Sequence, residues 1–264
     1  IIEEERVTDL RKTAYFSVLA ADILDRLLWR VRPYEKEPGM TDVFIEQAMR
    51  KMEASFEAYG SEKRYDEILR DLEGVVKEAR GIINPEIPPK PLVGIVGEIY
   101  LRTHEKANQD LIRLLESYGA EVVNASIAEW MNYTSYDRFR EAKKAFRLSV
   151  KQFRLSEAMS YFKRILNFGG DLFYQQHRQR QMYNRIGALL DIAEDHKVSH
   201  LDRLLEEEGF YSFEAGTEAC LSIPGIIEYV REGFSGVVNV YPFTCMPSTI
   251  TSAVVGPIMN RMKV

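Results

Sequence analysis

The stretch Val237-Val-Asn-Val-Tyr-Pro-Phe-Thr-Cys-Met-Pro-Ser-Thr-Ile250 joins a run of β-branched residues to a turn bracketed by two prolines. β-Branched residues favour strands, and the prolines end the strand and shape the turn after it. Residues 249–262 then show the spacing of apolar side chains that is typical of a helix. The stretch therefore predicts a buried strand, a turn and a helix, with Cys245 in the turn.

Cys245 is the first candidate for a functional residue. Ligands in open α/β sheets lie beyond the carboxyl ends of strands, which is where this cysteine is expected. The unpaired N–H groups at the start of a helix favour the thiolate, the form that binds metals or attacks electrophiles. A cysteine in such a turn can equally be a small buried apolar residue, and we expect that role for Cys220.

Two further β-rich runs, residues 92–97 and 121–125, precede helical patterns. Together with residues 237–241 they predict one parallel sheet, because the links between the runs are long enough for helical crossovers. Such crossovers place helices on both faces of a sheet. The predicted fold class is α/β, with a small parallel Rossmann-like sheet and extensive helical layers.

Helical patterns fill most of the remaining chain. Residues 1–83 predict a helical segment, and residues 84–91 predict a stiff linker because four of these eight residues are proline. Residues 92–264 are expected to form a Rossmann-like α/β lobe with a long helical insertion at about 136–208. Because the helical pattern is already present at Ile1, we expect the chain to be a fragment of a larger protein.

Several signals mark where the helices start and break. Ser126 followed by Glu129 is a capping box, which predicts a short helix after Ser126. Residues 106–118 predict a helix between the first two strands. Gly169-Gly170 predicts a break within the insertion, because glycine is a poor helix former.

The composition excludes several classes of function. The net charge of −5 and the isoelectric point near 5.6 give no general attraction to nucleic acid or to an anionic membrane. No apolar run approaches the roughly 20 residues that cross a bilayer. Two cysteines cannot form the disulfide framework of a small secreted domain. We therefore expect a cytoplasmic protein with free thiols that binds neither nucleic acid nor membrane.

Two other features resemble known binding motifs without matching them. Gly94 and Gly97 lack both the G-x-G-x-x-G spacing of dinucleotide sites and the lysine of a P-loop. His196 and His200 are four residues apart, a spacing that can bind zinc, but they do not form H-E-x-x-H and no third ligand is evident. We therefore expect the two histidines to lie on a solvated helix face.

Several blocks of the chain resemble, in order, the 2-hydroxyacyl-CoA dehydratase and CoA enzyme activase-related family, and in particular its less characterised activase-like branch. The blocks cover most of the chain and comprise Arg32-Pro-Tyr-Glu35, Pro38-Gly39, residues 90–102, Asn108, residues 119–123, Glu129-Trp-Met131 and residues 239–249. The resemblance implies Rossmann-like lobes that hold an iron–sulfur cluster on cysteines. It also implies low-potential electron transfer or reductive dehydration of a CoA thioester, with an activase or dehydratase partner subunit.

The resemblance also implies roles for individual residues. Cys245 would be an iron ligand, and Glu98, Tyr100, Arg102 and Asn108 would form a polar wall in a crevice shared with it. A 4Fe–4S cluster takes about three or four thiolates, so the remaining ligands would come from sequence outside this chain or from a partner chain.

Two alternatives stay open. Glu98 and Arg102 could merely cap a helix or form an ion pair. The chain as a whole could be a non-catalytic ligand-binding or assembly module with the same fold, and its oligomeric state is open.

Overall fold

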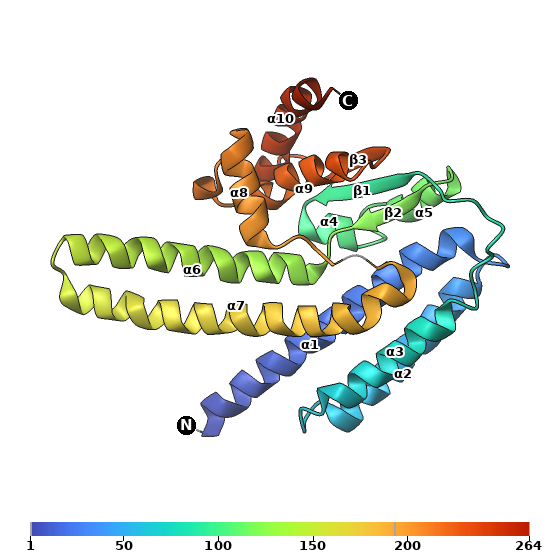
Figure 1. The fold of residues 1–264 in the computed structure, drawn as a ribbon, viewed down its shortest axis with the longest axis horizontal. Coiled ribbons are helices and arrows are strands. Elements are labelled where there is room, and N and C mark those ends of the chain that lie inside the picture. The colour runs from blue at the N-terminus through green and yellow to red at the C-terminus, as the bar shows by residue number, and fades with distance from the viewer. Residues whose placement is uncertain (1, 193, 264) are drawn as a thin grey trace.

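The computed structural model describes residues 2–192 and 194–263, with side chains from residue 9 onward. Its sheet consists of β1 (Leu92–Gly97), β2 (Glu121–Asn124) and β3 (Gly236–Val240), which are parallel and lie in the order β2-β1-β3 (Figure 1). The α/β class and the single parallel sheet predicted from the three β-rich runs are therefore confirmed.

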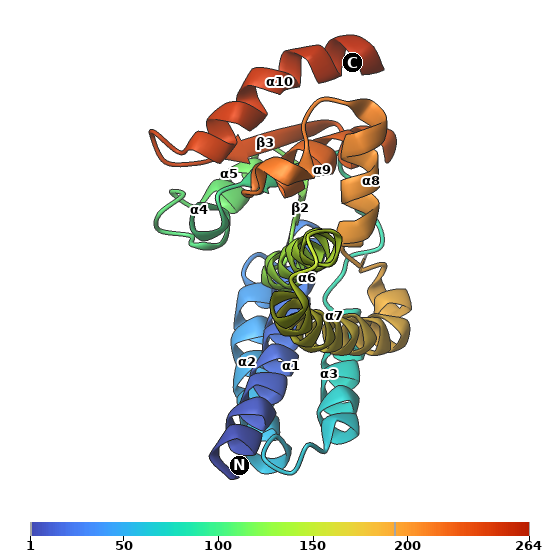
Figure 2. The same ribbon diagram turned by 90° about the vertical axis from the view of Figure 1, so that its left-hand side faces the viewer.

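The helices form two groups, one beside the sheet and one that makes a separate helical layer. Beside the sheet lie α4 (Ile99–Thr103), α5 (Leu111–Ser117), α8 (Val198–Glu208), α9 (Ala219–Arg231) and α10 (Met246–Met262). The helical layer contains α1 (Ile2–Val31), α2 (Met40–Tyr59), α3 (Tyr65–Ala79), α6 (Ile127–Lys151) and α7 (Leu155–Leu190). Figure 2 shows the helical layer below the sheet, and α1 of this layer also contacts β2 directly.

Helices cover both faces of the sheet, as expected for right-handed crossovers. Successive side chains of a strand point to opposite faces. Ile95 of β1 accordingly packs with Ile112 of α5, whereas Val96 belongs to the apolar cluster that contains α9 and α10. Gly94 points toward α9, and a Cβ there would lie 2.4 Å from the Tyr229 ring. Glycine at this position therefore lets Tyr229 pack directly on the sheet.

The core of the helical layer combines segments that are far apart in the sequence. Phe16 and Ile23 of α1 and Ile68 of α3 belong to the same buried apolar cluster as Met182 and Ile186 of α7. The insertion therefore packs against the N-terminal helices rather than forming a layer of its own.

The structure corrects three details of the helix predictions. The helix that Ser126 caps is 25 residues long rather than short. No break occurs at Gly169-Gly170 within the described α7; the chain turns at Phe153, whose φ is 57°. A Cβ on Gly169 would lie 3.2 Å from the ring of Phe139, so close packing of α7 on α6 offsets the helix-breaking tendency of glycine, about 1 kcal/mol per residue.

The third correction concerns the helix expected over residues 106–118. Only Leu111–Ser117 is helical there, and Asp110 before it has a left-handed backbone conformation. The side chain of Asn108 accepts a hydrogen bond from the Leu111 backbone N–H at 3.2 Å. This bond marks a helix start that the apolar spacing alone did not reveal.

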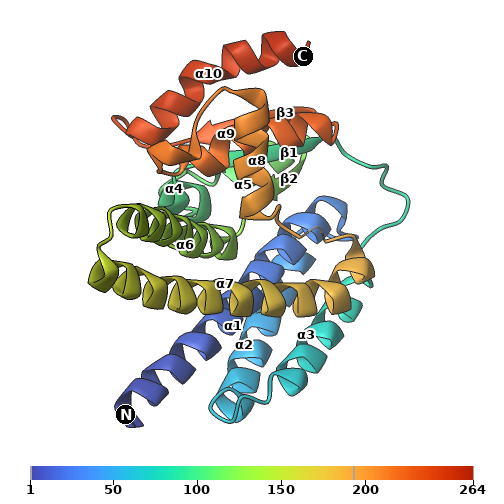
Figure 3. The same cartoon turned by 60° about the vertical axis from the view of Figure 1, so that its left-hand side comes forward.

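The proline-rich linker joins α3 to β1 and begins with a turn, in which Ile87 N donates to the Asn84 carbonyl at 3.3 Å (Figure 3). Tyr34 holds it at both ends, because its carbonyl accepts from Asn84 N at 2.7 Å and its hydroxyl accepts from Lys90 N at 2.9 Å. The linker thus follows the surface between the two groups of helices. No helix in the described part of the chain is both long and apolar enough to cross a membrane.

Candidate functional site

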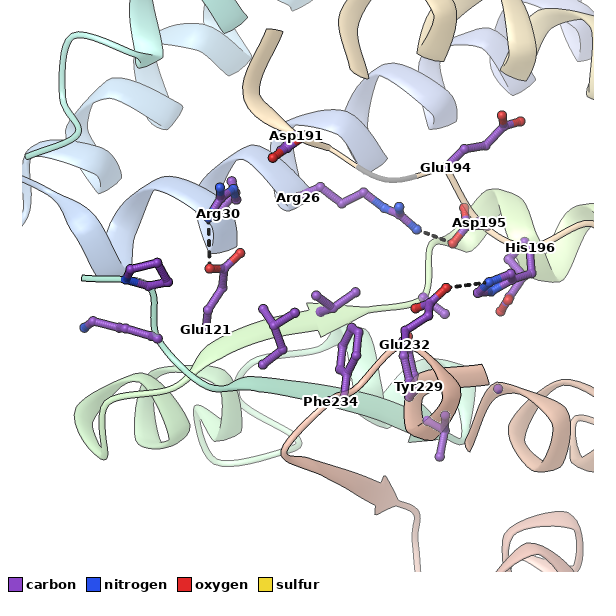
Figure 4. A pocket seen from close by; sticks show the side chains of 18 of the residues that line it. Arg26, Arg30, Glu121, Asp191, Glu194, Asp195, His196, Tyr229, Glu232 and Phe234 are labelled. Carbon is purple, nitrogen blue, oxygen red and sulfur yellow. Dashed lines mark hydrogen bonds and ion pairs between the residues drawn. The ribbon is translucent and has the colours of Figure 1, made fainter. Parts of the chain in front are cut away.

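A cavity of about 630 Å³ lies between the helical layer and the sheet, and we call it the interlobe cavity. Its walls come from α1, the linker, β2, α9, and residue 191 with residues 194–196 (Figure 4). Apolar side chains, among them Val96, Val123 and Phe234, contribute to its lining together with charged groups. This volume and mixed lining are typical of sites that bind small organic molecules.

An ionic cluster lies at one end of the interlobe cavity. Glu121 at the start of β2 forms an ion pair with Arg30 at 2.9 Å and accepts a hydrogen bond from the Tyr34 hydroxyl at 2.6 Å. Burial, followed by the bond to Glu121, raises the pKa of Tyr34. Because Glu121 contacts Arg30 of α1 and Tyr34, which also binds the linker, this end holds the linker and β2 to α1.

A second cluster joins α1 to residues 194–196 and to the start of α6. Arg26 and Asp195 form a buried ion pair, which Figure 4 shows at the cavity wall. Asp195 also accepts a hydrogen bond from the Ser126 hydroxyl at 2.6 Å. Ser126 in turn accepts from Glu129 N at 3.0 Å, which confirms the predicted helix cap. The cluster therefore fixes three segments that are far apart in sequence.

The start of α6 is held by a second buried carboxylate. Asp22 accepts hydrogen bonds from the backbone N–H groups of Ile127 at 3.0 Å and Ala128 at 2.9 Å. Burial nevertheless raises the pKa of Asp22 to about 7. This carboxyl and the cap at Ser126 together fix the first turn of α6, which carries Glu129.

Arg102 and Glu129 form the least satisfied ionic pair of the cavity. The Arg102 side chain is only 3% exposed, and its Nη2 lies 3.7 Å from Glu129 Oε2, too far for a normal hydrogen bond. Arg102 Nε is buried without a hydrogen-bond partner in the described part of the chain. Burial raises the pKa of Glu129 to about 7. The Arg102 guanidinium therefore keeps hydrogen-bonding capacity next to the cavity.

The polar wall predicted from the family resemblance is dispersed in the described structure. Glu98 caps α4 by accepting from Leu101 N at 2.8 Å, and Tyr100 is exposed beside His104. Asn108 donates to the Leu101 carbonyl at 2.8 Å and lines, with Arg102, a separate small pocket next to α1. Of the four residues, Arg102 lines the interlobe cavity.

Cys245 lies where the sequence predicted, at the start of α10 and beyond the end of β3. Its side chain is half-buried, and its carbonyl accepts from Thr249 N at 3.0 Å in the first turn of α10. Glu98 N donates to Val240 O at 2.9 Å, so the ends of β1 and β3 are neighbours. Neither Glu98 nor Cys245 lines the interlobe cavity or the three smaller cavities described with it, and a crevice shared by the two residues stays a prediction.

The cysteines do not by themselves fit an iron–sulfur cluster. Cys220 is fully buried, its thiol lies 3.1 Å from the Gly216 carbonyl, and burial raises its pKa to about 12. It therefore belongs to the core, in agreement with the prediction. In the described part of the chain no group of metal-ligating side chains gathers around Cys245. With two cysteines in the chain, a four-thiolate cluster needs ligands from elsewhere.

The two histidines do not share a helix face, contrary to the prediction. His196 precedes α8, whereas His200 lies within its first turn. His196 contacts Glu228 and Glu232 near the end of α9, which provide the carboxylates that were not evident from the sequence. Glu228 lies in the last turn of α9 and Glu232 just after it, and their spacing of four residues was a signal that could have identified them.

Sequence reasoning also missed Arg26 and Asp195, which line the cavity, and Asp22, which lies near them outside its lining. Asp22 and Arg26 are charged residues on the buried face of α1, four residues apart, a pattern that could have marked them. No comparable signal pointed to Asp195 in its irregular segment. Comparison with protein-family models, with curated proteins and with solved structures found no match to this chain.

Proposed function

We propose that this chain is a ligand-binding module that holds a small organic carboxylate in the interlobe cavity. The observation that carries the proposal is the buried Arg102 guanidinium, whose Nε has no partner among the described residues and whose contact with Glu129 spans 3.7 Å. Buried cations are normally fully paired and hydrogen-bonded, because desolvation is otherwise costly. A ligand carboxylate supplies the acceptors that a planar guanidinium binds in parallel.

The other contacts of the cavity favour Arg102 as the anchor. The Arg30 guanidinium is paired with Glu121, and Arg26 is paired with Asp195. The apolar lining provided by Val123 and Phe234 suits the hydrocarbon part of a ligand, because buried apolar area contributes most of the binding free energy. Glu129, with its pKa of about 7, can hold a proton beside the bound carboxylate.

The test compares a charged ligand with its neutral analogue. We expect 2-hydroxyisocaproate to bind the wild-type protein in isothermal titration calorimetry and its amide to bind much more weakly. Arg102→Met keeps the bulk of the side chain, removes its charge, and should weaken carboxylate binding by about 10- to 100-fold, as expected for charged hydrogen bonds of about 1.5–3 kcal/mol. Arg70→Met, on the exposed face of α3, is the matched control.

Folding must be checked separately, because Arg102→Met leaves Glu129 without its cation. The double variant Arg102→Met, Glu129→Gln removes both charges and should regain the stability of the wild type without regaining carboxylate binding. Equal affinity for the carboxylate in the wild type and in the double variant would contradict the proposal. Inorganic phosphate, titrated in parallel, distinguishes a carboxylate site from a general anion site.

A second function is favoured by the place of Cys245. We propose, following the family resemblance, that it supplies one ligand to an iron–sulfur cluster completed outside this chain, in a 2-hydroxyacyl-CoA dehydratase-like or activase-related system. Phe243, in the turn before Cys245, is 96% exposed, and Met246, directly after Cys245, is 60% exposed. Exposed apolar side chains of this size suit contact with a partner subunit. A Rossmann-like sheet, a cytoplasmic location and a CoA thioester as substrate belong to this proposal.

The iron–sulfur proposal predicts a specific effect of the two cysteines. Isolated without oxygen, the intact protein together with its partner subunit should contain iron and sulfide, and Cys245→Ala should lose most of both. Cys220→Ala is the matched control, because that thiol is sealed in the core and its loss should lower stability while iron content stays unchanged. An unchanged iron and sulfide content in Cys245→Ala would exclude it as a ligand.

A further inference from the structure

A group of metal-ligating side chains lies at the edge of the interlobe cavity, apart from Arg102. His196 Nε2, a Glu228 carboxylate oxygen and a Glu232 carboxylate oxygen all lie within 4.8 Å of one another. His196 and Glu232 both line the cavity, and Figure 4 shows them facing each other, His196 from the residues before α8 and Glu232 from just after α9. We propose that these three residues bind a divalent transition metal ion such as zinc.

The separations between the ligand atoms match the size of such an ion. His196 Nε2 lies 2.9 Å from Glu232 Oε1 and 3.6 Å from Glu228 Oε2. Ligands about 2.0–2.1 Å from a tetrahedral zinc ion lie roughly 3.3 Å apart. The three groups can therefore close around one ion with small side-chain movements.

Outer contacts already orient Glu228 toward the site. Glu228 Oε1 accepts a hydrogen bond from Arg231 Nη1 at 3.2 Å and lies 3.4 Å from His200 Nε2. Glu228 Oε2 faces His196. Partners that hold the far atom of a metal ligand are a regular feature of metal sites. His200 thus has a positioning role, which also accounts for the spacing of the two histidines.

The charges of this region favour a cation. Glu228 and Glu232 lie in the last turn of α9 and just after it, where the helix dipole is negative and carboxylates are unfavourable. The cavity as a whole is lined, among the described residues, by six carboxylates and four Arg or Lys side chains. A divalent cation bound by His196 and the two glutamates would offset this surplus of negative charge.

The ligand set indicates the class of metal and the kind of site. One imidazole and two carboxylates suit zinc and neighbouring transition metals better than calcium or magnesium, which prefer oxygen ligands only. Three protein ligands leave a fourth position for water or a ligand molecule, as in catalytic zinc sites. Metal binding takes the lone pair of His196 Nε2, so any proton on that atom is released to solvent.

The test uses the metal ion alone as the probe, on the whole chain freed of metal with a chelator. We expect one zinc ion per chain in calorimetry, and cobalt titration should give the visible spectrum of a four-coordinate site without thiolate charge-transfer bands. His196→Ala and Glu232→Gln should each weaken zinc binding at least tenfold, and His200→Ala should weaken it less. All measurements are repeated with Cys245→Ser to remove binding to that thiol.

Two controls make the outcome decisive. His177→Ala removes an exposed histidine of α7 and should leave zinc affinity unchanged. Circular dichroism tests whether each variant is folded. If His196→Ala does not fold, Glu232→Gln tests the site in its place. Absence of zinc binding, or equal zinc affinity in the wild type and in folded His196→Ala and Glu232→Gln, would overturn the proposal. Carboxylate binding by Arg102 is measured without metal, so the two proposals fail independently.

Discussion

Replacing Asp195 with alanine is expected to destabilise the protein by about 3–5 kcal/mol, the cost typical of removing one partner of a buried ion pair. Asp195 pairs with Arg26, and both side chains are buried. The substitution also removes the acceptor of the Ser126 hydroxyl, at 2.6 Å. Denaturant unfolding followed by circular dichroism measures the loss.

An exposed ion pair provides the control for Asp195. Asp171 pairs with Arg11 at 2.9 Å, but both side chains are largely in solvent. Asp171→Ala should therefore cost no more than about 1 kcal/mol. Similar losses of unfolding free energy in the two variants would show that the cluster around Asp195 does not hold α1 to the start of α6.

Replacing Gly97 with alanine is expected to cost about 3 kcal/mol or more. Gly97 ends β1 with a φ of 121°, a conformation that other residues rarely adopt, and a Cβ there would lie 2.1 Å from the Val240 carbonyl oxygen. The strain of the backbone and the forced separation of β1 from β3 act together. Denaturant unfolding measures the change in the free energy of unfolding.

Gly119 separates these two effects. Its φ is also positive, at 91°, but a Cβ there would meet nothing within 4 Å. Gly119→Ala should therefore cost only about 1 kcal/mol, the strain of the backbone alone. If Gly97→Ala cost no more than Gly119→Ala, the close approach of β1 to β3 would not be a constraint on the sheet.

The strands were predictable because their signal is local. Each of the three strands is a short β-rich run, so neighbouring residues alone were enough to identify it. The structure pairs the three runs in parallel, as predicted. The uninterrupted course of α7 through Gly169 was not predictable, because it depends on packing against Phe139 of another helix. Tertiary contacts there outweigh intrinsic helix propensity.

The site was less predictable than the fold because its residues meet only in three dimensions. Arg26 and Asp195 are 169 positions apart and belong to a helix and an irregular segment. Arg102 was identified as a site residue, but the sequence placed it in a crevice with Cys245 rather than opposite Glu129. The histidine pair was recognised, but its contact with Glu228 and Glu232 depends on how the chain around His196 packs against the end of α9.

The interlobe cavity is the central claim, and a structure of the protein with 2-hydroxyisocaproate tests it most directly. We predict that the ligand carboxylate lies within hydrogen-bonding distance, about 3 Å, of the Arg102 guanidinium. The hydrocarbon part should then lie against Val123 and Phe234. A ligand bound elsewhere, with Arg102 still facing Glu129 at 3.7 Å, would contradict the account.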